Sequence, residues 1–336
     1  MPVPLLRTSE RKDFKRCPWL WNETWVKGLV SRRVPTWAWF GTAIHAGLEA
    51  WYIPGRKRGG LKAMLKAFEV SMDGNIGKIY IQGGEIDDDE RMDAAELGRL
   101  MLTGYVEHYG KETEWEVIHS EQPFQINVPH PNKPGKFIVC YAGTWDVVMW
   151  NRVTKEFWLW DHKTRKAFLQ NWSYLELDDQ PGSYIWVAER VLRHKGILGE
   201  KDTVEGIVFN FLRKAPPDAR PTNDAGEALN RDGTVSKRQP AARYHREEVY
   251  RSRHEVVSLA HRVQAEAQVM ARMRKGTLPL YKTPAEDCAR CKLFDYCVLD
   301  EQDPEAAAEY ANATMMTRDP YADHREDMEA KEGVEL

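Results

Sequence analysis

The sequence of 336 residues lacks several features that would place it in other classes of protein. No apolar run approaches the ~20 residues that a membrane helix needs, so we expect no membrane partner. The N-terminus has no apolar core like that of a secretory signal, and the expected location is the cytoplasm. The sequence contains no GxxxxGKS or GxxxxGKT phosphate loop, so it predicts no helicase motor.

Cysteine is scarce, with five residues at uneven spacing. An odd number argues against a disulfide framework, and clustered cysteines in an intracellular protein more often bind metal. Cys288, Cys291 and Cys297 lie close together, and Cys17 is the candidate for a distant fourth ligand. Four cysteines suit either tetrahedral zinc or an iron–sulfur cluster, and composition does not choose between them. Cys140 lies in an apolar run and is expected in the core.

The net charge of −3 is unevenly distributed. Residues 300–336 contain twelve acidic and three basic residues, so the rest of the chain carries +6. Basic residues cluster in 1–33 and 236–254. Clustered positive charge suits a phosphate backbone, because neutralised phosphates release counterions, although a solvated surface gives the same pattern. The acidic C-terminal residues predict a mobile appendage or a partner-binding segment.

The order of the expected elements predicts an α/β fold with a mixed central sheet flanked by helices. Helical spacing and end signals predict helices at 41–52, 61–70, 87–109, 181–194 and 255–274. Runs rich in Val, Ile, Phe and Trp predict strands at 115–128, 136–150, 156–161, 204–212 and 244–250. Asp178 and Asp179 precede the fourth helix as capping candidates. Residues 215–242 are rich in Pro, Gly and Asp and predict a long loop.

Two carboxylates and a lysine are expected to meet on two of these strands. If the strands form a hairpin that turns over residues 151–155, opposed positions sum to about 307, which pairs Asp146 with Asp161. Opposed side chains lie roughly 5 Å apart, so two like charges there need a cation between them. Lys163 lies on the same face as Asp161. The set suits phosphodiester hydrolysis with Mg²⁺ or Mn²⁺, whereas an exposed strand pair with incidental charges is the simpler alternative.

Two further pairs of residues at helical spacing extend this pattern. His45 and Glu49 stand four residues apart on the first expected helix, so both point the same way. Gln180 and Tyr184 are also four apart, at the start of the helix that follows the hairpin. Each pair alone means little. The order His, Asp, Asp-x-Lys and Gln-x-x-x-Tyr is more informative.

In this order of motifs the sequence resembles the RecB-like branch of the PD-(D/E)XK nuclease superfamily. That branch includes the nuclease domains of RecB and AddB and the CRISPR-associated RecB-like exonucleases. The resemblance extends from about residue 7 to residue 297. Its matching segments are Phe14-Lys-Arg-Cys17-Pro-Trp, Gly41-Thr-Ala-Ile-His45, Gly143-Thr-Trp-Asp146, Asp161-His-Lys163 and Gln180-Pro-Gly-Ser-Tyr184. Asp161 stands where many relatives have Glu.

The resemblance implies a role for each matching residue. The catalytic metal would be bound by His45, Asp146, Asp161 and the backbone carbonyl of His162. Lys163 would assist the attacking water, and Gln180 and Tyr184 would line the substrate side. The shared pattern of one early and three late cysteines implies a structural 4Fe-4S cluster bound by Cys17, Cys288, Cys291 and Cys297, with zinc as the alternative.

The function implied is a metal-dependent DNA exonuclease acting at DNA ends or on single strands, in recombination, replication or repair. A CRISPR spacer-processing nuclease and a DNA-end-binding scaffold protein with little activity are the alternatives. Implied partners besides DNA are a recombinase, a single-strand-binding protein or CRISPR adaptation proteins, and a phage member would act in the host cytoplasm. Ring-forming relatives make an oligomer an open expectation.

The expected organisation is one nuclease domain over residues 1–300, followed by the acidic tail at 301–336. Within the domain we expect a helical part at about 1–110, a catalytic sheet core at about 111–275 and a cysteine segment at 284–300. The cluster would join the two ends of this domain.

Overall fold

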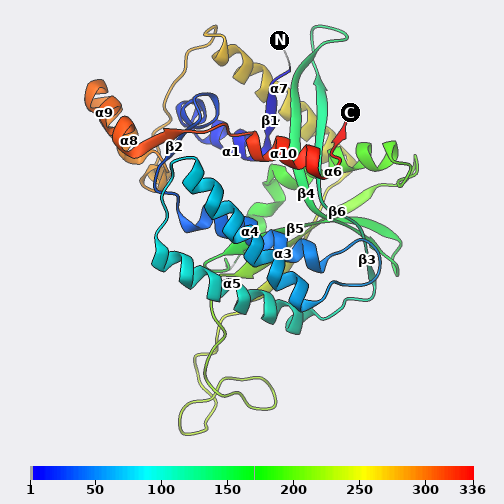
Figure 1. Cartoon of the computed structure of the whole chain (residues 1–336). Coiled ribbons are helices and arrows are strands. Elements are labelled where there is room, and N and C mark those ends of the chain that lie inside the picture. The colour runs from blue at the N-terminus through cyan, green and yellow to red at the C-terminus, as the bar shows by residue number, and fades with distance from the viewer. Residues whose placement is uncertain (1–2, 170) are drawn as a thin grey trace.

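The computed structural model describes residues 3–169 and 171–336, and a seven-stranded sheet lies at its centre (Figure 1). Six strands follow the order β7-β6-β5-β4-β3-β9, and β1 pairs with β4 off this path. The strands are β1 (Leu5–Arg7), β3 (Trp115–Pro129), β4 (Phe137–Asn151), β5 (Glu156–Arg165), β6 (Val204–Arg213), β7 (Tyr244–Tyr250) and β9 (Val334–Glu335). A separate two-stranded sheet pairs β2 (Leu29–Ser31) with β8 (Met315–Thr317).

The central sheet is mixed, as the sequence predicts. Strands β5 and β6 run parallel, whereas β3–β4, β4–β5 and β6–β7 are antiparallel. In the β4–β5 hairpin the paired positions run from Asn151–Glu156 to Val147–Trp160, so every pair sums to 307. This confirms the predicted register. The next pair along the hairpin would be Asp146 and Asp161, and the regular pairing stops just before it.

Helices cover both faces of the sheet (Figure 1). One face packs against α3 (Thr36–Trp51), α4 (Leu61–Ile81) and α5 (Asp88–Tyr109). The other packs against α6 (Asp179–His194) and α7 (Arg253–Arg274), with α1 (Thr8–Arg16) beside α6. The remaining elements are α2 (Pro18–Trp21), the π-helical turn η1 (Asn22–Val26), the 3₁₀ turns η2 (Ser173–Leu177) and η3 (Glu286–Arg290), α8 (Phe294–Gln302), α9 (Pro304–Thr314) and α10 (Ala322–Ala330).

Side-chain caps fix the start of two helices where the sequence predicts them. The carboxylate of Asp87 accepts hydrogen bonds from the backbone N–H groups of Asp89 and Glu90 at the start of α5. Asp178 caps α6 by accepting from the N–H of Gln180. Such caps satisfy donors that the first helical turn leaves unpaired. The cap on α6 matters for the site, because it places Gln180 in the first turn.

The acidic tail differs from the mobile appendage that its charge predicts. It forms α9, β8, α10 and β9, and β9 adds to the edge of the sheet beside β3. Its few apolar and neutral side chains are the reason, since Met315, His324 and Val334 are all buried. In contrast, residues 214–243 form the predicted irregular loop, which projects away from the body between β6 and β7 (Figure 1).

Candidate active site

The polar site lies where β4 and β5 separate beyond their last regular pair. There the backbone N–H of His162 donates a hydrogen bond to Oδ2 of Asp146, at 2.5 Å. The carboxylate therefore takes the place of a strand partner. Asp146 and Asp161 are both buried, at 7% and 2% exposure, on these neighbouring strands. Burying two carboxylates is costly unless cationic groups or donors surround them.

Three side chains from three elements converge at this point. They are His45 from α3, Glu121 from β3 and Asp146 from β4, and one ligand atom of each lies within 4.8 Å of the others. Nδ1 of His45 is 3.4 Å from both Glu121 Oε1 and Asp146 Oδ1. Oε1 of Glu121 is buried, and no described residue donates a hydrogen bond to it. Imidazole and carboxylate donors with an unsatisfied oxygen suit a divalent cation.

Glu121 is a site residue that the sequence reasoning missed. It lies between the paired positions Ser120–Val147 and Gln122–Trp145, which places it opposite Asp146. Its φ of 45° is in the left-handed region, which a residue other than glycine adopts at a cost in free energy. Four consecutive polar residues, His119 to Gln122, interrupt the alternation of this strand in the sequence. That signal could have found it, had the register of β3 against β4 been known.

Asp161 and Lys163 lie on the next strand, beside this group. Lys163 makes an ion pair with Oδ2 of Asp161. Oδ1 of the same carboxylate accepts a hydrogen bond of 2.8 Å from Nε2 of Gln180, in the first turn of α6. Both oxygens of Asp161 are thus engaged by the two residues that sequence patterns placed near it. Tyr184, one turn further along α6, lines the same cavity.

Mutual electrostatic effects set the charges of these groups. Burial alone would lower the pKa of His45, but the carboxylates of Asp146 and Glu121 outweigh it and raise that pKa well above its ordinary value. Burial would raise the pKa of Asp146, and His45 outweighs burial and lowers it. For Glu121 burial dominates, so its pKa is raised. Without a metal, the imidazolium therefore stands where a cation would balance the carboxylates.

The Asp161–Lys163 pair shows the same competition. Burial raises the pKa of Asp161, because the opposing effect of Lys163 is smaller and Asp146 adds a like charge. Burial lowers the pKa of Lys163, yet Asp161 and Asp146 outweigh it and the net shift is upward. Lys163 therefore stays protonated at neutral pH and presents an ammonium group to the cavity. Its side chain remains one third exposed.

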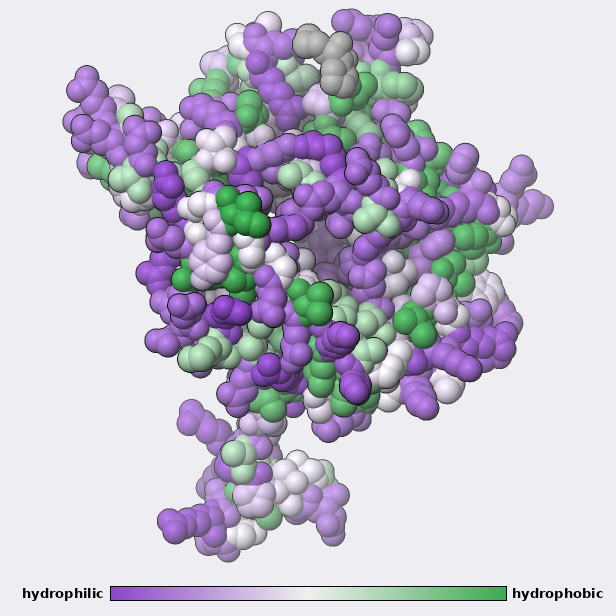
Figure 2. All heavy atoms as spheres, viewed as in Figure 1, coloured by the Kyte–Doolittle hydropathy of each residue, from purple (hydrophilic) through white to green (hydrophobic). Residues whose placement is uncertain are grey.

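These residues line a single cleft of about 490 Å³. All six side chains that the sequence singled out for the catalytic site line it, as does Glu121: His45, Asp146, Asp161, Lys163, Gln180 and Tyr184. Figure 2 shows a hollow ringed by hydrophilic residues, between the positions of α10 and of α3 and α4 in Figure 1.

The side chain of His162 lies outside this cleft. Its ring stacks on Tyr52 and its Nδ1 pairs with Nδ2 of Asn210 at 2.9 Å. Burial lowers its pKa to about 3, so the ring is neutral. His162 contacts the site through its backbone N–H, which binds Asp146, whereas the resemblance implicates its backbone carbonyl.

The four cysteines form a second cavity, of about 340 Å³, that the N-terminal segment and the C-terminal part of the chain build together. It is lined by Cys17, Cys288, Cys291 and Cys297, all of which are free thiols. The backbone N–H of Ala285 points at Sγ of Cys288, at 3.3 Å. Among the described residues, no three of these sulfur atoms lie within 4.8 Å of one another.

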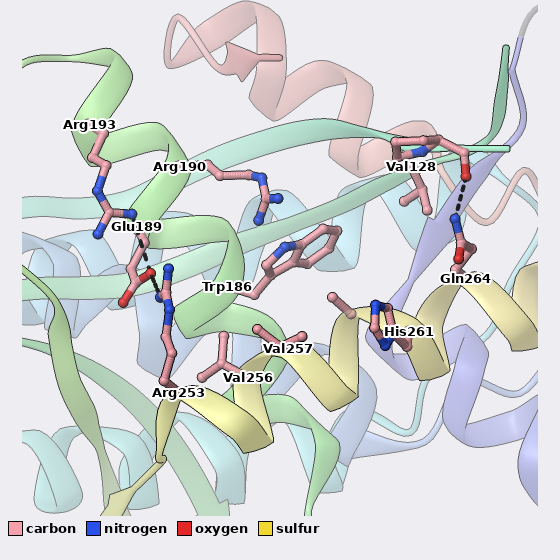
Figure 3. Close-up of a pocket in the computed structure, with 12 residues that line it drawn as sticks. Val128, Trp186, Glu189, Arg190, Arg193, Arg253, Val256, Val257, His261 and Gln264 are labelled. Carbon is pink, nitrogen blue, oxygen red and sulfur yellow. Dashed lines mark hydrogen bonds and ion pairs between the residues drawn. The ribbon is translucent and has the colours of Figure 1, made fainter. Parts of the chain in front are cut away.

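A third depression lies between the C-terminal half of α6 and the N-terminal half of α7, and Figure 3 shows its lining. Trp186 forms its floor with Arg190 over the indole ring, and the carboxylate of Glu189 pairs with Arg193 and Arg253. Val128 and Pro129, which also border it, lie at the C-terminal end of β3. It shares no lining residue with the catalytic cleft.

A known protein family matches most of this chain. The sequence profile of the PD-(D/E)XK nuclease superfamily matches residues 8–298. A solved protein from Eubacterium rectale, described as a candidate exonuclease, aligns over 85% of this chain and 87% of its own, at 11% identity and a TM-score of 0.38. Among curated proteins, none gives a match. Within the described residues, no helix is long and apolar enough to span a bilayer.

Proposed function

The chain belongs to the PD-(D/E)XK nuclease superfamily, and we propose that it is a metal-dependent deoxyribonuclease of the RecB-like branch that degrades DNA from ends or as single strands. One observation carries this proposal. His45, Glu121 and Asp146 form a cation-sized group, and the Asp161–Lys163 pair lines the same cleft. The order of motifs along the chain supports the RecB-like branch.

The proposed metal site contains His45, Glu121 and Asp146, with Asp161 and the carbonyl of His162 completing it on the side of β5. A bound Mg²⁺ or Mn²⁺ would polarise the phosphate and lower the pKa of a bound water. Of these residues, Glu121 is the addition that geometry makes to the set implied by the sequence.

The remaining groups position the substrate and the charge around it. Asp161 holds the ammonium group of Lys163 in place, where it can orient water and offset negative charge on the phosphate. Gln180 fixes the orientation of Asp161 through its 2.8 Å hydrogen bond. The phenol of Tyr184 stays protonated, because burial raises its pKa, and it offers a donor to the strand.

The four cysteines are proposed to hold a structural 4Fe-4S cluster. All four cysteines line one cavity, and four thiolates would suit either a 4Fe-4S cluster or a tetrahedral zinc ion. The pattern of one early and three late cysteines, shared with the RecB-like relatives, supports the cluster. The donor to Cys288 would suit a thiolate.

Cleavage of labelled DNA tests the catalytic proposal. Single- and double-stranded DNA, with free and with blocked 5′ and 3′ ends, are incubated with Mn²⁺ and the wild type, Asp161→Ala or Asp218→Asn. Asp218 is an exposed aspartate of the projecting loop, paired only with Arg220, and serves as the matched control. We expect the wild type and the control variant to degrade free ends and Asp161→Ala to fail. Wild type that binds ends but cuts no better than Asp161→Ala would favour the scaffold role.

Protein partners follow from this proposed function. A nuclease that acts on single strands would work beside a recombinase, a single-strand-binding protein or CRISPR adaptation proteins. Co-purification from cells that express the tagged chain would identify which of these binds. The end-blocking assay above separates exonuclease from endonuclease action.

A further inference from the structure

The C-terminal residues 315–336 extend beyond the part of the chain that the family profile matches, which ends at residue 298. They form a strap, made of β8, α10 and β9, that is held at both ends. At one end β8 pairs with β2, and at the other β9 pairs with β3. In between, the hydroxyl of Tyr321 donates to Glu10, at 2.7 Å. The strap is therefore a fixed part of the fold.

The helix of the strap lies over the catalytic cleft. It contacts β3, the strand that carries Glu121. Lys78 of α4 pairs with Glu326 at 2.5 Å, and Lys331 pairs with Glu49 of α3 at 2.6 Å. The strap helix α10 and the residue after it therefore contact α3, α4 and β3, which lie around the metal group. Figure 1 shows α10 above α3 and α4, with the hollow of Figure 2 between them.

One side chain of the strap is buried in this cleft with its polar atoms unsatisfied. Arg318, Asp323, His324 and Asp327 all line the cavity that contains Asp146 and Lys163. His324 is only 1% exposed, and neither of its ring nitrogens has a hydrogen-bond partner among the described residues. Buried polar groups are nearly always satisfied, so such a ring indicates a group that binds there.

His324 offers a hydrogen-bond donor in a cavity that groups of both charges line. Burial, together with the positive charge of Arg7, lowers the pKa of His324 to about 4, so the ring is neutral and has one N–H donor and one acceptor. Arg7 and Arg318 line the same cavity, and Asp323 and Asp327 are the acids on the same helix that also line it. His324 is not among the ligand atoms that converge with His45 on the metal group.

We propose that the C-terminal strap forms one wall of the substrate site and that the ring N–H of His324 donates a hydrogen bond to a phosphate of the bound DNA strand. This inference rests on the proposed nuclease function. It assigns substrate contact to a segment outside the matched family region. The strap deepens the cleft, so a DNA strand that reaches the metal group gains contacts. The set of catalytic residues stays the same.

Binding measured without cleavage tests this contact. A fluorescein-labelled oligothymidylate is titrated with protein in Ca²⁺, which replaces Mg²⁺ as a cation with the same preference for oxygen ligands, and anisotropy is followed. His324→Phe keeps a flat ring and removes the polar atoms, whereas His324→Gln keeps a donor and an acceptor. Glu329→Gln is the matched control, since Glu329 is exposed on the same helix and does not line the cleft.

Loss of a hydrogen bond to a charged phosphate predicts about tenfold weaker binding for His324→Phe. We expect a smaller loss for His324→Gln, no change for Glu329→Gln and Tm values close to wild type. In Mn²⁺ the same variants should raise KM more than they lower kcat.

Two results would overturn the proposal. Equal binding by all four proteins would make His324 a structural residue, and tighter binding by His324→Phe would make the strap an inhibitory cover. If the wild type binds the oligonucleotide in Ca²⁺ but never cuts in Mn²⁺, the nuclease function fails while the binding comparison still tests the strap.

Discussion

The catalytic cleft and the cysteine cavity are assembled in the same way, but the first would serve catalysis and the second stability. Each brings together side chains that are far apart in the sequence, His45 with Asp146 in one and Cys17 with Cys288 in the other. In the cleft the assembled groups are buried carboxylates, whose repulsion the imidazolium of His45 reduces and a bound cation would reduce further. In the cavity they are thiols at the two ends of the family region, whose joining would restrict the unfolded chain.

Activity and stability should therefore be separable in this protein. Changes in the cleft should abolish cleavage and leave the fold intact, or make it more stable. Changes in the cavity should reduce stability first and activity only through unfolding.

The largest effect is expected for Asp146→Asn. The change keeps the shape of the side chain and removes the charge that the metal group needs. Since a bound metal contributes several kcal/mol to phosphate cleavage, we expect activity to fall by about a thousandfold. Circular dichroism should show a folded protein. A variant with more than a tenth of wild-type activity would show that the metal group is placed elsewhere.

Cys17→Ser should have the next largest effect, on stability. A cluster held by Cys17 and the late cysteines would close a loop of some 270 residues, so its loss should lower Tm on the order of 10 °C. Protein purified without oxygen should also lose its brown colour and its broad absorption. Cys140→Ser, in a strand away from the cavity, is the control and should keep the absorption. A colourless wild type with bound zinc would contradict the cluster.

Glu121→Gln should move the two properties in opposite directions. Burial, together with the like charge of Asp146, raises the pKa of this carboxyl group, so keeping it ionised without a metal lowers the stability of the fold. Its replacement should raise Tm slightly and weaken Mn²⁺ binding about ten- to a hundredfold, as loss of groups around a metal commonly does. In the wild type the affinity for Mn²⁺ should rise with pH, since Glu121 and Asp161 must lose protons. Calorimetric titration with Mn²⁺ measures both effects.

The smallest expected effect concerns acid stability. Burial lowers the pKa of His119 to about 4 and that of His162 to about 3. In the unfolded chain these histidines bind protons near pH 6.5. Their contribution to the free energy of unfolding is therefore complete above that pH and is lost as the pH falls toward 4. We expect Tm to drop by several degrees between pH 7 and pH 5. His119→Asn should make this drop shallower, and an unchanged slope would contradict the assignment.

Sequence patterns predicted those parts of the site that depend on signals within a few residues. The turn over 151–155 and the alternation along the two strands fixed the register of the hairpin that carries Asp146 and Asp161. The cap at Asp178 located the start of α6 and hence Gln180. These signals lie within a few residues of what they determine, so no knowledge of the fold was needed.

The rest of the site depends on long-range packing. Glu121 joins it only through the register of β3 against β4 and a left-handed backbone conformation. His324 reaches the cleft because β8 and β9 dock the tail on two different sheets, whereas charge alone predicted a mobile segment. Neither pairing has a nearby sequence signal, since each joins residues that are far apart along the chain or separated by an irregular turn.

An anomalous difference map from a crystal soaked in Mn²⁺ would test the proposed metal group directly. We predict a peak bounded by His45, Glu121 and Asp146, with Lys163 beside Asp161 at its edge. A Mn²⁺ peak elsewhere in the molecule, with these side chains unchanged and bound to one another, would contradict the metal-dependent mechanism.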